Sequence, residues 1–258
     1  MPDVRTEDVR ISLLSGEQLP AMLALPERTP APAVLVINDV FGRSDFYDHL
    51  TRRIAQAGFV ALDPEYFFRE GPVPQDDRAA ATDRREKLVQ RRVLDDLDTA
   101  FAWLAARGDV GGDRFGTIGF CMGGTFALDL AASRGDLATV SYYGFPAARR
   151  PDMSPPLDVA ARMTGPILGH FGTEDTGVGM DNVRELDRRL TAAGVEHELH
   201  TYEGLGHGFL KTFLENESAP GYEQACTSWK RTLDFWRRHL SRELSGSEAW
   251  EAQRDDGW

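Results

Sequence analysis

Apolar residues along the chain fall into two patterns, short unbroken runs and longer stretches with helical spacing. Unbroken runs such as "AVLVI" at 33–37 are typical of strands that are buried on both faces. In the stretch that follows, Phe46, Leu50 and Ile54 recur at four-residue spacing, which predicts an amphipathic helix. A second apolar run at 59–65 then completes one β–α–β unit.

The alternation of strand and helix continues along the chain. We expect an N-terminal hairpin followed by parallel strands, at 9–14, 21–26, 33–39, 59–65, 114–120, 138–144, 165–175 and 196–204. We expect helices at 44–58, from Leu88 to Leu104, and at 123–133, 181–194 and 228–240. The Pro-rich, acidic segment 69–83 is interpreted as a surface excursion. This order of elements predicts an α/β fold with a mostly parallel central sheet and helices on both faces.

A chain of 258 residues is typical of one larger domain, which we assign to residues 1–240. Residues 241–258 are polar and lack a clear period, so we expect a mobile tail there. The N-terminus lacks the apolar block of a signal peptide, and the longest apolar run is too short to cross a bilayer. We therefore expect a cytoplasmic protein, a monomer or homodimer, without membrane association.

Charge narrows the range of partners. The chain carries 41 acidic and 29 basic side chains, a formal net charge of −12, which argues against nucleic acid or anionic membranes as main partners. A small anionic substrate remains compatible with this charge, because exposed charges are screened over about 10 Å and a local cation in a cleft outweighs them. The histidine and cysteine spacings match no common zinc pattern, so we expect no metal site.

The stretch "GFCMGG" places Cys121 between Gly119 and Gly123 at a predicted strand-to-helix junction. This G-x-C-x-G spacing is the nucleophile-elbow pattern, with cysteine in place of serine. Small neighbours fit such a turn, because a side chain two residues away on either side would collide with the tightly folded backbone. We interpret Cys121 as a nucleophile; a buried small hydrophobe or a redox thiol are the other readings.

A thiol nucleophile needs a base, and the base needs an orienting acid. In proteins built on such an elbow, the acid and then the histidine follow the nucleophile along the chain. Asp175 and His207 fit this order, and each follows a predicted strand at the edge of the sheet where the elbow ends. Glu174 is the rival acid, and a turn residue or helix cap is the alternative role for Asp175.

A tetrahedral intermediate needs two hydrogen-bond donors already aimed at its oxyanion. In proteins with this elbow, the donors come from the residue after the nucleophile and from a loop after an early strand. These positions are the backbone N–H groups of Met122 and of Val40 in "INDVFG".

The segments "GFCMGG", "INDVFG", "DPEYF", "YYG", "GTED" and "GLGHGF" together resemble the dienelactone hydrolase (carboxymethylenebutenolidase) family of cysteine-nucleophile α/β-hydrolases. The likeness runs from about residue 8 to about residue 240. It implies a catalytic triad of Cys121, His207 and Asp175, with Val40 and Met122 as the oxyanion hole. It also implies hydrolysis of a small unsaturated lactone that carries a carboxylate, without a cofactor.

Two positions depart from the family pattern. Asp39 stands where the family typically has a glutamate that contacts the resting thiol, and aspartate is one methylene shorter. Lys211 stands where the family has an arginine that holds the substrate carboxylate, and lysine keeps the charge but loses the bidentate fork. A second carboxylate-binding arginine of the family corresponds most closely to Arg78.

The sequence therefore predicts a hydrolase that cleaves a small activated lactone or ester, expected to carry a carboxylate, through an acyl-thioester intermediate. A thiolate suits such substrates, because it attacks activated acyl groups well but is itself a good leaving group. Two alternatives remain. The same triad would act on a thioester or a natural-product lactone, or the protein would be a non-hydrolytic binding protein or thiol sensor on the same fold.

Overall fold

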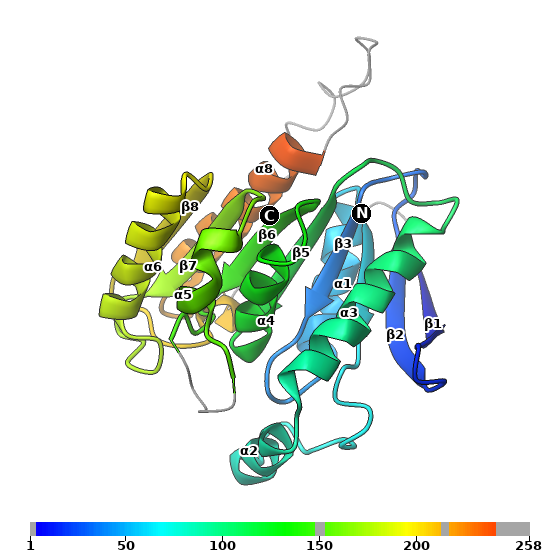
Figure 1. Cartoon of the computed structure of the whole chain (residues 1–258), viewed down its shortest axis with the longest axis horizontal. Coiled ribbons are helices and arrows are strands. Elements are labelled where there is room, and N and C mark those ends of the chain that lie inside the picture. The colour runs from blue at the N-terminus through cyan, green and yellow to red at the C-terminus, as the bar shows by residue number, and fades with distance from the viewer. Residues whose placement is uncertain (1–3, 148–152, 213–216, 241–258) are drawn as a thin grey trace.

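A computed structural model of the chain describes residues 4–147, 153–212 and 217–240 (Figure 1). Its core is an eight-stranded sheet of β1 (Arg5–Ser12), β2 (Gln18–Leu25), β3 (Ala33–Ile37), β4 (Val60–Pro64), β5 (Phe115–Phe120), β6 (Leu137–Tyr142), β7 (Ile167–Gly172) and β8 (His197–Tyr202). The strand order is β1-β2-β4-β3-β5-β6-β7-β8. The pairs β1·β2 and β2·β4 are antiparallel and all others parallel. The mostly parallel sheet is therefore confirmed.

Helices cover both faces of this sheet, as expected (Figure 1). They are α1 (Asp45–Gln56), α2 (Arg78–Glu86), α3 (Gln90–Ala105), α4 (Met122–Ala131), α5 (Pro156–Val159), α6 (Met180–Ala193) and α8 (Tyr222–Leu240), with 3-10 turns η1 (Ala160–Arg162) and η2 (Phe209–Lys211). Leu50 of α1 and Trp236 of α8 belong to one apolar cluster, and Phe101 of α3 and Phe126 of α4 to another. Because both faces are covered, β3 to β7 are buried along their whole length.

The segment before α3 differs from the expectation. We expected a surface excursion over 69–83 followed by one long helix, whereas a separate helix, α2, begins at Arg78 and Leu88 lies between the two helices. Asp77 caps α2, since its carboxylate accepts a hydrogen bond of 2.8 Å from the Ala80 N–H. Only Ala81 and Arg84 of this helix are buried, so it shows almost no apolar period in the sequence.

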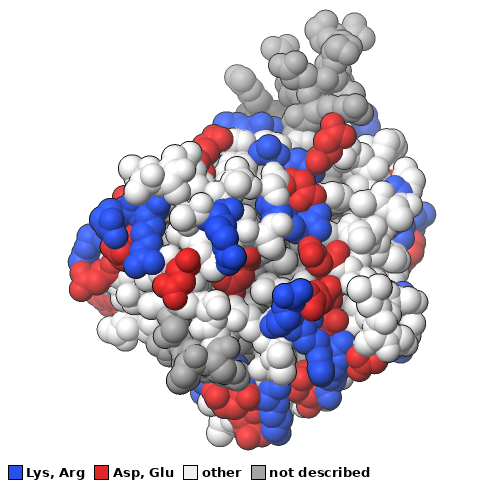
Figure 2. All heavy atoms as spheres, viewed as in Figure 1, with Lys and Arg blue, Asp and Glu red and all other residues white. Residues whose placement is uncertain are grey.

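The loops after β3, β5, β7 and β8 end at the same edge of the sheet, where ligands bind in open parallel sheets. On the face that carries α3, α4 and α6, basic and acidic side chains are mixed rather than segregated (Figure 2). Within the described ranges, no helix has the length and apolar character needed to cross a membrane. The predicted tail, residues 241–258, lies outside the described residues.

A buried polar network ties the sheet to α8. His170 of β7 is fully buried, its Nδ1 lies 2.9 Å from the Tyr202 hydroxyl, and its Nε2 lies 3.2 Å from the Thr232 hydroxyl. The Tyr142 hydroxyl lies 2.9 Å from the same Thr232 oxygen. Burial, together with the nearby charges of His200 and Arg231, holds the pKa of His170 well below its usual value. His170 is therefore neutral in the folded protein.

We expect this histidine to make the fold acid-sensitive. Below its ordinary pKa of about 6.5, His170 takes up a proton on unfolding, so the free energy of unfolding falls by as much as about 2 kcal/mol between pH 6.5 and 5. At pH 8 the variant His170→Gln should be less stable than the wild type by about 1–2 kcal/mol, because glutamine fits the hydrogen-bond partners of His170 less well. Because glutamine does not titrate, that difference should narrow by pH 5, as measured by urea unfolding.

The matched control for this test is His49→Gln, because His49 is exposed on α1. Its unfolding free energy should follow the wild-type pH dependence. If the difference in unfolding free energy between His170→Gln and the wild type stayed constant from pH 8 to pH 5, His170 would not be a neutral, titrating group of the folded protein.

Candidate active site

Cys121 occupies the junction between β5 and α4 in a conformation that few residues adopt. Its φ of 56° and ψ of −119° lie outside the usual regions for a residue with a side chain. The turn is held by two backbone hydrogen bonds, from the Cys121 N–H to the Tyr142 carbonyl (3.0 Å) and from the Thr125 N–H to the Cys121 carbonyl (3.2 Å). Cys121 is 8% exposed, so its sulfur lies at the edge of the core beside the cleft.

Nearby backbone atoms leave no room for a side chain at either glycine that flanks Cys121. A Cβ on Gly119 would lie 2.0 Å from the Gly123 carbonyl oxygen, and a Cβ on Gly123 would lie 2.1 Å from the Ile37 carbonyl oxygen. Both distances are far shorter than any real contact, and backbone atoms cannot move aside cheaply. The glycine at 119 lets β5 turn closely into α4, and the glycine at 123 lets α4 approach the end of β3.

His207 and Asp175 are brought together from separate loops. The His207 Nδ1 lies 2.6 Å from the Asp175 Oδ2, while the Asp175 Oδ1 accepts hydrogen bonds of 3.1 Å from the N–H groups of Gly177 and Val178. The ring of Phe145 stacks on the imidazole with a centroid distance of 5.4 Å and an angle of 21°. The carboxylate and the imidazole therefore have fixed orientations.

The surroundings of His207 favour its charged form. Burial by itself would lower the pKa of His207, but hydrogen bonds to the side chains of Asp175 and Cys121, together with their charges, raise it to about 9. Burial likewise opposes ionisation of Asp175, yet its hydrogen bonds to His207 and to two N–H groups hold the Asp175 pKa below its usual value. The rival acid Glu174 is exposed, and it is Asp175 that contacts His207.

The loop after β3, which carries Val40, is anchored on several sides. The Tyr66 hydroxyl donates to the Asn38 carbonyl over 2.9 Å, and the Asp39 N–H donates to the Tyr47 hydroxyl over 3.1 Å. The Val40 carbonyl accepts a hydrogen bond of 2.9 Å from the buried guanidinium of Arg84. Sequence reasoning missed Arg84, because an arginine in a polar stretch gives no sign that it is buried.

Asp39 and Lys211 form a pair beside this loop. The Asp39 Oδ1 accepts a hydrogen bond of 2.9 Å from the Phe41 N–H, and its Oδ2 lies 3.6 Å from the Lys211 Nζ. The two predicted substrate or thiol contacts therefore contact each other. Among the described residues, those that line the cleft include Arg78 but neither Asp39 nor Lys211.

Three buried tyrosines surround the site. Burial, reinforced by the negative charges of Asp39 and Cys121, raises the pKa values of Tyr47, Tyr66 and Tyr143 well above their usual range. The tyrosines therefore stay protonated, and Tyr47 and Tyr66 serve as hydrogen-bonding groups to the loop after β3.

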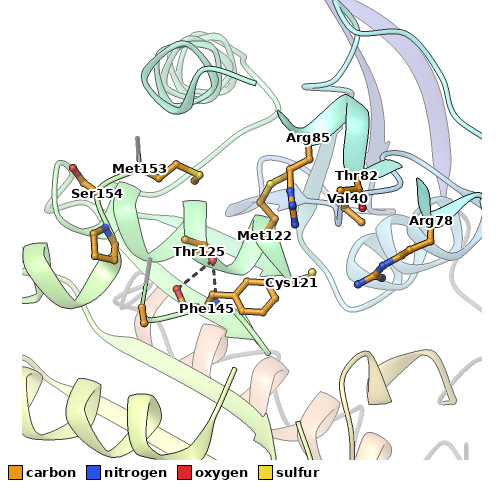
Figure 3. Close-up of a pocket in the computed structure, with 12 residues that line it drawn as sticks. Val40, Arg78, Thr82, Arg85, Cys121, Met122, Thr125, Phe145, Met153 and Ser154 are labelled. Carbon is orange, nitrogen blue, oxygen red and sulfur yellow. Dashed lines mark hydrogen bonds between the residues drawn. The ribbon is translucent and has the colours of Figure 1, made fainter. Parts of the chain in front are cut away.

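A cleft opens beside Cys121, Met122 and Val40 (Figure 3). One wall is formed by α2 and includes Arg78, the predicted carboxylate contact, and Arg85, which sequence reasoning missed. The spacing of these two arginines, seven residues apart, would have revealed the shared face had α2 been predicted as a helix. The described residues contain no group of three or more His, Cys, Asp or Glu side chains that could hold a metal ion.

The sheet order and the sharp turn between β5 and α4 define an α/β-hydrolase fold, as expected. The chain matches the model of the dienelactone hydrolase family over residues 19–240 and belongs to that family. The predicted resemblance is thus confirmed, and the protein is a hydrolase of this family.

Individual relatives support the same assignment. Carboxymethylenebutenolidase of Rhodococcus opacus is 31% identical over 229 residues, covering 87% of this chain and 88% of the relative. A probable 2-oxo-3-(5-oxofuran-2-ylidene)propanoate lactonase of a Bradyrhizobium species is 34% identical over 230 residues, covering 88% and 92%. The crystal structure of a putative dienelactone hydrolase from Klebsiella pneumoniae superposes with a TM-score of 0.83 at 29% identity, covering 92% of this chain and 99% of that one.

The elbow glycine gives a direct structural test. Gly123→Ala should lower the free energy of unfolding by at least about 2 kcal/mol, because the new methyl group meets the backbone of β3. Gly108→Ala is the matched control: Gly108 has open space around its Cβ position and should change stability by no more than about 0.5 kcal/mol. Equal urea-unfolding midpoints for the two variants would refute the contact.

Proposed function

We propose that this protein hydrolyses a small activated lactone or ester that carries a carboxylate. In this proposal Cys121 is the nucleophile, His207 its base and Asp175 the acid that orients the imidazole. The observation that carries the proposal is the position of His207, which is hydrogen-bonded to Asp175 and interacts with the Cys121 side chain at a strained elbow. This order of nucleophile, base and orienting acid is the arrangement that activates a thiol.

The reaction would proceed in two halves. The charges of Cys121 and Asp175 hold the proton on His207, so we infer a thiolate–imidazolium pair as the reactive form. The thiolate attacks the acyl carbon, and the N–H groups of Val40 and Met122 stabilise the oxyanion. As the carbon–oxygen bond breaks, His207 donates its proton to the leaving oxygen and a thioester of Cys121 remains. A water then attacks the thioester, His207 takes its proton, and the acid and the thiolate are released.

The supporting groups suit this chemistry. Met122 begins α4, so its N–H lies at the positive end of a helix next to the site of the negative charge. We assign the Asp39–Lys211 pair to the support of the loop that carries Val40, because the Asp39 carboxylate binds the Phe41 N–H in that loop. Arg78, which lines the cleft, is the cation that we assign to the substrate carboxylate.

The relatives' names fit a lactone substrate, since one is called a carboxymethylenebutenolidase and another a lactonase. A thioester or a natural-product lactone would use the same residues, and a substrate panel separates these classes. A thiol sensor needs neither an orienting carboxylate nor a stacked imidazole. The fixed pair of Asp175 and His207 therefore favours a hydrolase.

The nucleophile assignment is tested with Cys121→Ala. Hydrolysis of p-nitrophenyl acetate should fall at least about 10³-fold, because the variant lacks the sulfur that accepts the acyl group in this proposal. Cys226→Ala, which removes the other cysteine, should keep near wild-type activity, since Cys226 lies on α8 in the described structure. Undiminished turnover by Cys121→Ala would refute the assignment.

The acid assignment is tested by titrating the His207 imidazole by NMR. In the wild type we expect protonation with a pKa of about 9. Asp175→Asn removes the negative charge that opposes burial and leaves only a neutral amide as the partner, so the pKa of His207 should fall well below 9. Glu174→Gln, a charge removal one residue away on an exposed side chain, should leave the titration in place. If Glu174→Gln lowered the pKa of His207 more than Asp175→Asn did, Glu174 would be the partner of His207.

A further inference from the structure

Helix α2 presents three polar side chains to the cleft. Arg78, Thr82 and Arg85 all line it, and their spacing of four and seven residues places them on one face of the helix. With a rise of 1.5 Å per residue, the backbones of Arg78 and Arg85 lie about 10 Å apart along the axis. Figure 3 shows both guanidinium groups reaching toward the space around the Cys121 sulfur. Two separate cations therefore enter the cleft from the same wall.

We propose that the natural substrate carries two anionic groups, one bound by Arg78 and the other by Arg85, with the Thr82 hydroxyl between them. This inference rests on the hydrolase function proposed above and specifies its substrate class as a dicarboxylate ester or lactone. Each guanidinium fork can donate two parallel hydrogen bonds to a carboxylate of its own, so a cleft that contains both arginines offers sites for two carboxylates.

The rest of the cleft strengthens this selectivity. Its other lining includes apolar side chains, among them Met122, Phe145 and Met153, and an apolar surface makes the attraction between a guanidinium and a carboxylate stronger than in water. The chain as a whole carries a formal net charge of −12, which repels a dianion at a distance. Close guanidinium contacts inside the cleft are therefore the feature that admits such a substrate.

Arg85 already has an anionic neighbour that a substrate can displace. Its Nε and Nη2 lie 3.1 and 2.6 Å from the Glu86 Oε1. The Glu86 side chain is 49% exposed, so water solvates its carboxylate readily when Arg85 turns to another anion. Arginine also suits a planar carboxylate better than lysine does, because its fork donates two parallel hydrogen bonds.

The test uses four aryl esters that differ only in where a carboxylate stands. They are the butanoate and the hydrogen glutarate of 4-nitrophenol, and the same two esters of 3-carboxy-4-nitrophenol, so the set contains one neutral, two monoanionic and one dianionic ester. We expect wild-type kcat/KM to be highest for the dianionic ester. Arg85→Gln and Arg78→Gln should each lower kcat/KM for esters that carry one of the two carboxylates, at least about tenfold more than for the neutral ester.

The two substitutions should lower kcat/KM for different esters. One should act on esters with a carboxylate in the acyl part, and the other on esters with a carboxylate in the leaving group. Lys87→Gln is the matched control, because Lys87 ends the same helix, pairs with Asp83 on the surface and does not line the cleft. It should leave the ranking of the four esters unchanged. Arg85→Lys, which keeps the charge, should restore part of the loss in Arg85→Gln and exclude a folding defect as its cause.

Several outcomes would overturn the proposal. They are a wild-type preference for either monoanionic ester over the dianionic one, an equal loss on all four esters in Arg85→Gln, and a loss in Lys87→Gln as large as in Arg85→Gln. Failure of the underlying hydrolase function has a different signature, since Cys121→Ala would then hydrolyse the neutral ester as fast as the wild type. The two failures are therefore distinguishable in one set of assays.

Discussion

The close packing of the Gly119 backbone against Gly123, and of Gly123 against the end of β3, holds the site together. These contacts force Cys121 into its strained conformation and bring the first turn of α4 beside the loop that carries Val40. Backbone contacts thus position the proposed nucleophile and bring the two proposed oxyanion donors close together. Side chains complete the arrangement, since Arg84 and Tyr66 hold carbonyl groups of the loop.

A second constraint is electrostatic. Asp175 accepts a hydrogen bond from His207 in a largely buried site, and hydrogen bonds to Asp175 and Cys121 raise the pKa of His207 to about 9. Burial, and after it the negative charge of Asp39, raises the pKa values of the nearby tyrosines and keeps their hydroxyls protonated. The site therefore stabilises one positive charge, on the imidazole, and neutral hydrogen-bonding groups around it.

Much of the fold and the pairing of His207 with Asp175 could be predicted from the sequence, because both depend on local patterns and on the rule that parallel strands end at one edge. Helix α2 could not, since only Ala81 and Arg84 of its nine residues are buried. The choice between Glu174 and Asp175 also needed the structure. Adjacent residues after a strand point in different directions, and no sequence pattern says which one faces the imidazole.

The missed helix connects two parts of the site. Its residues Arg84 and Arg85 are adjacent and point in different directions: the Arg84 guanidinium is buried against the Phe67 ring and donates to the Val40 carbonyl, while Arg85 faces the cleft. One short helix therefore supports the proposed oxyanion donor and contacts the proposed substrate anion. A displacement of α2 would move both groups together, so we expect substrate binding on this wall to be coupled to the geometry of the loop that carries the proposed oxyanion donor.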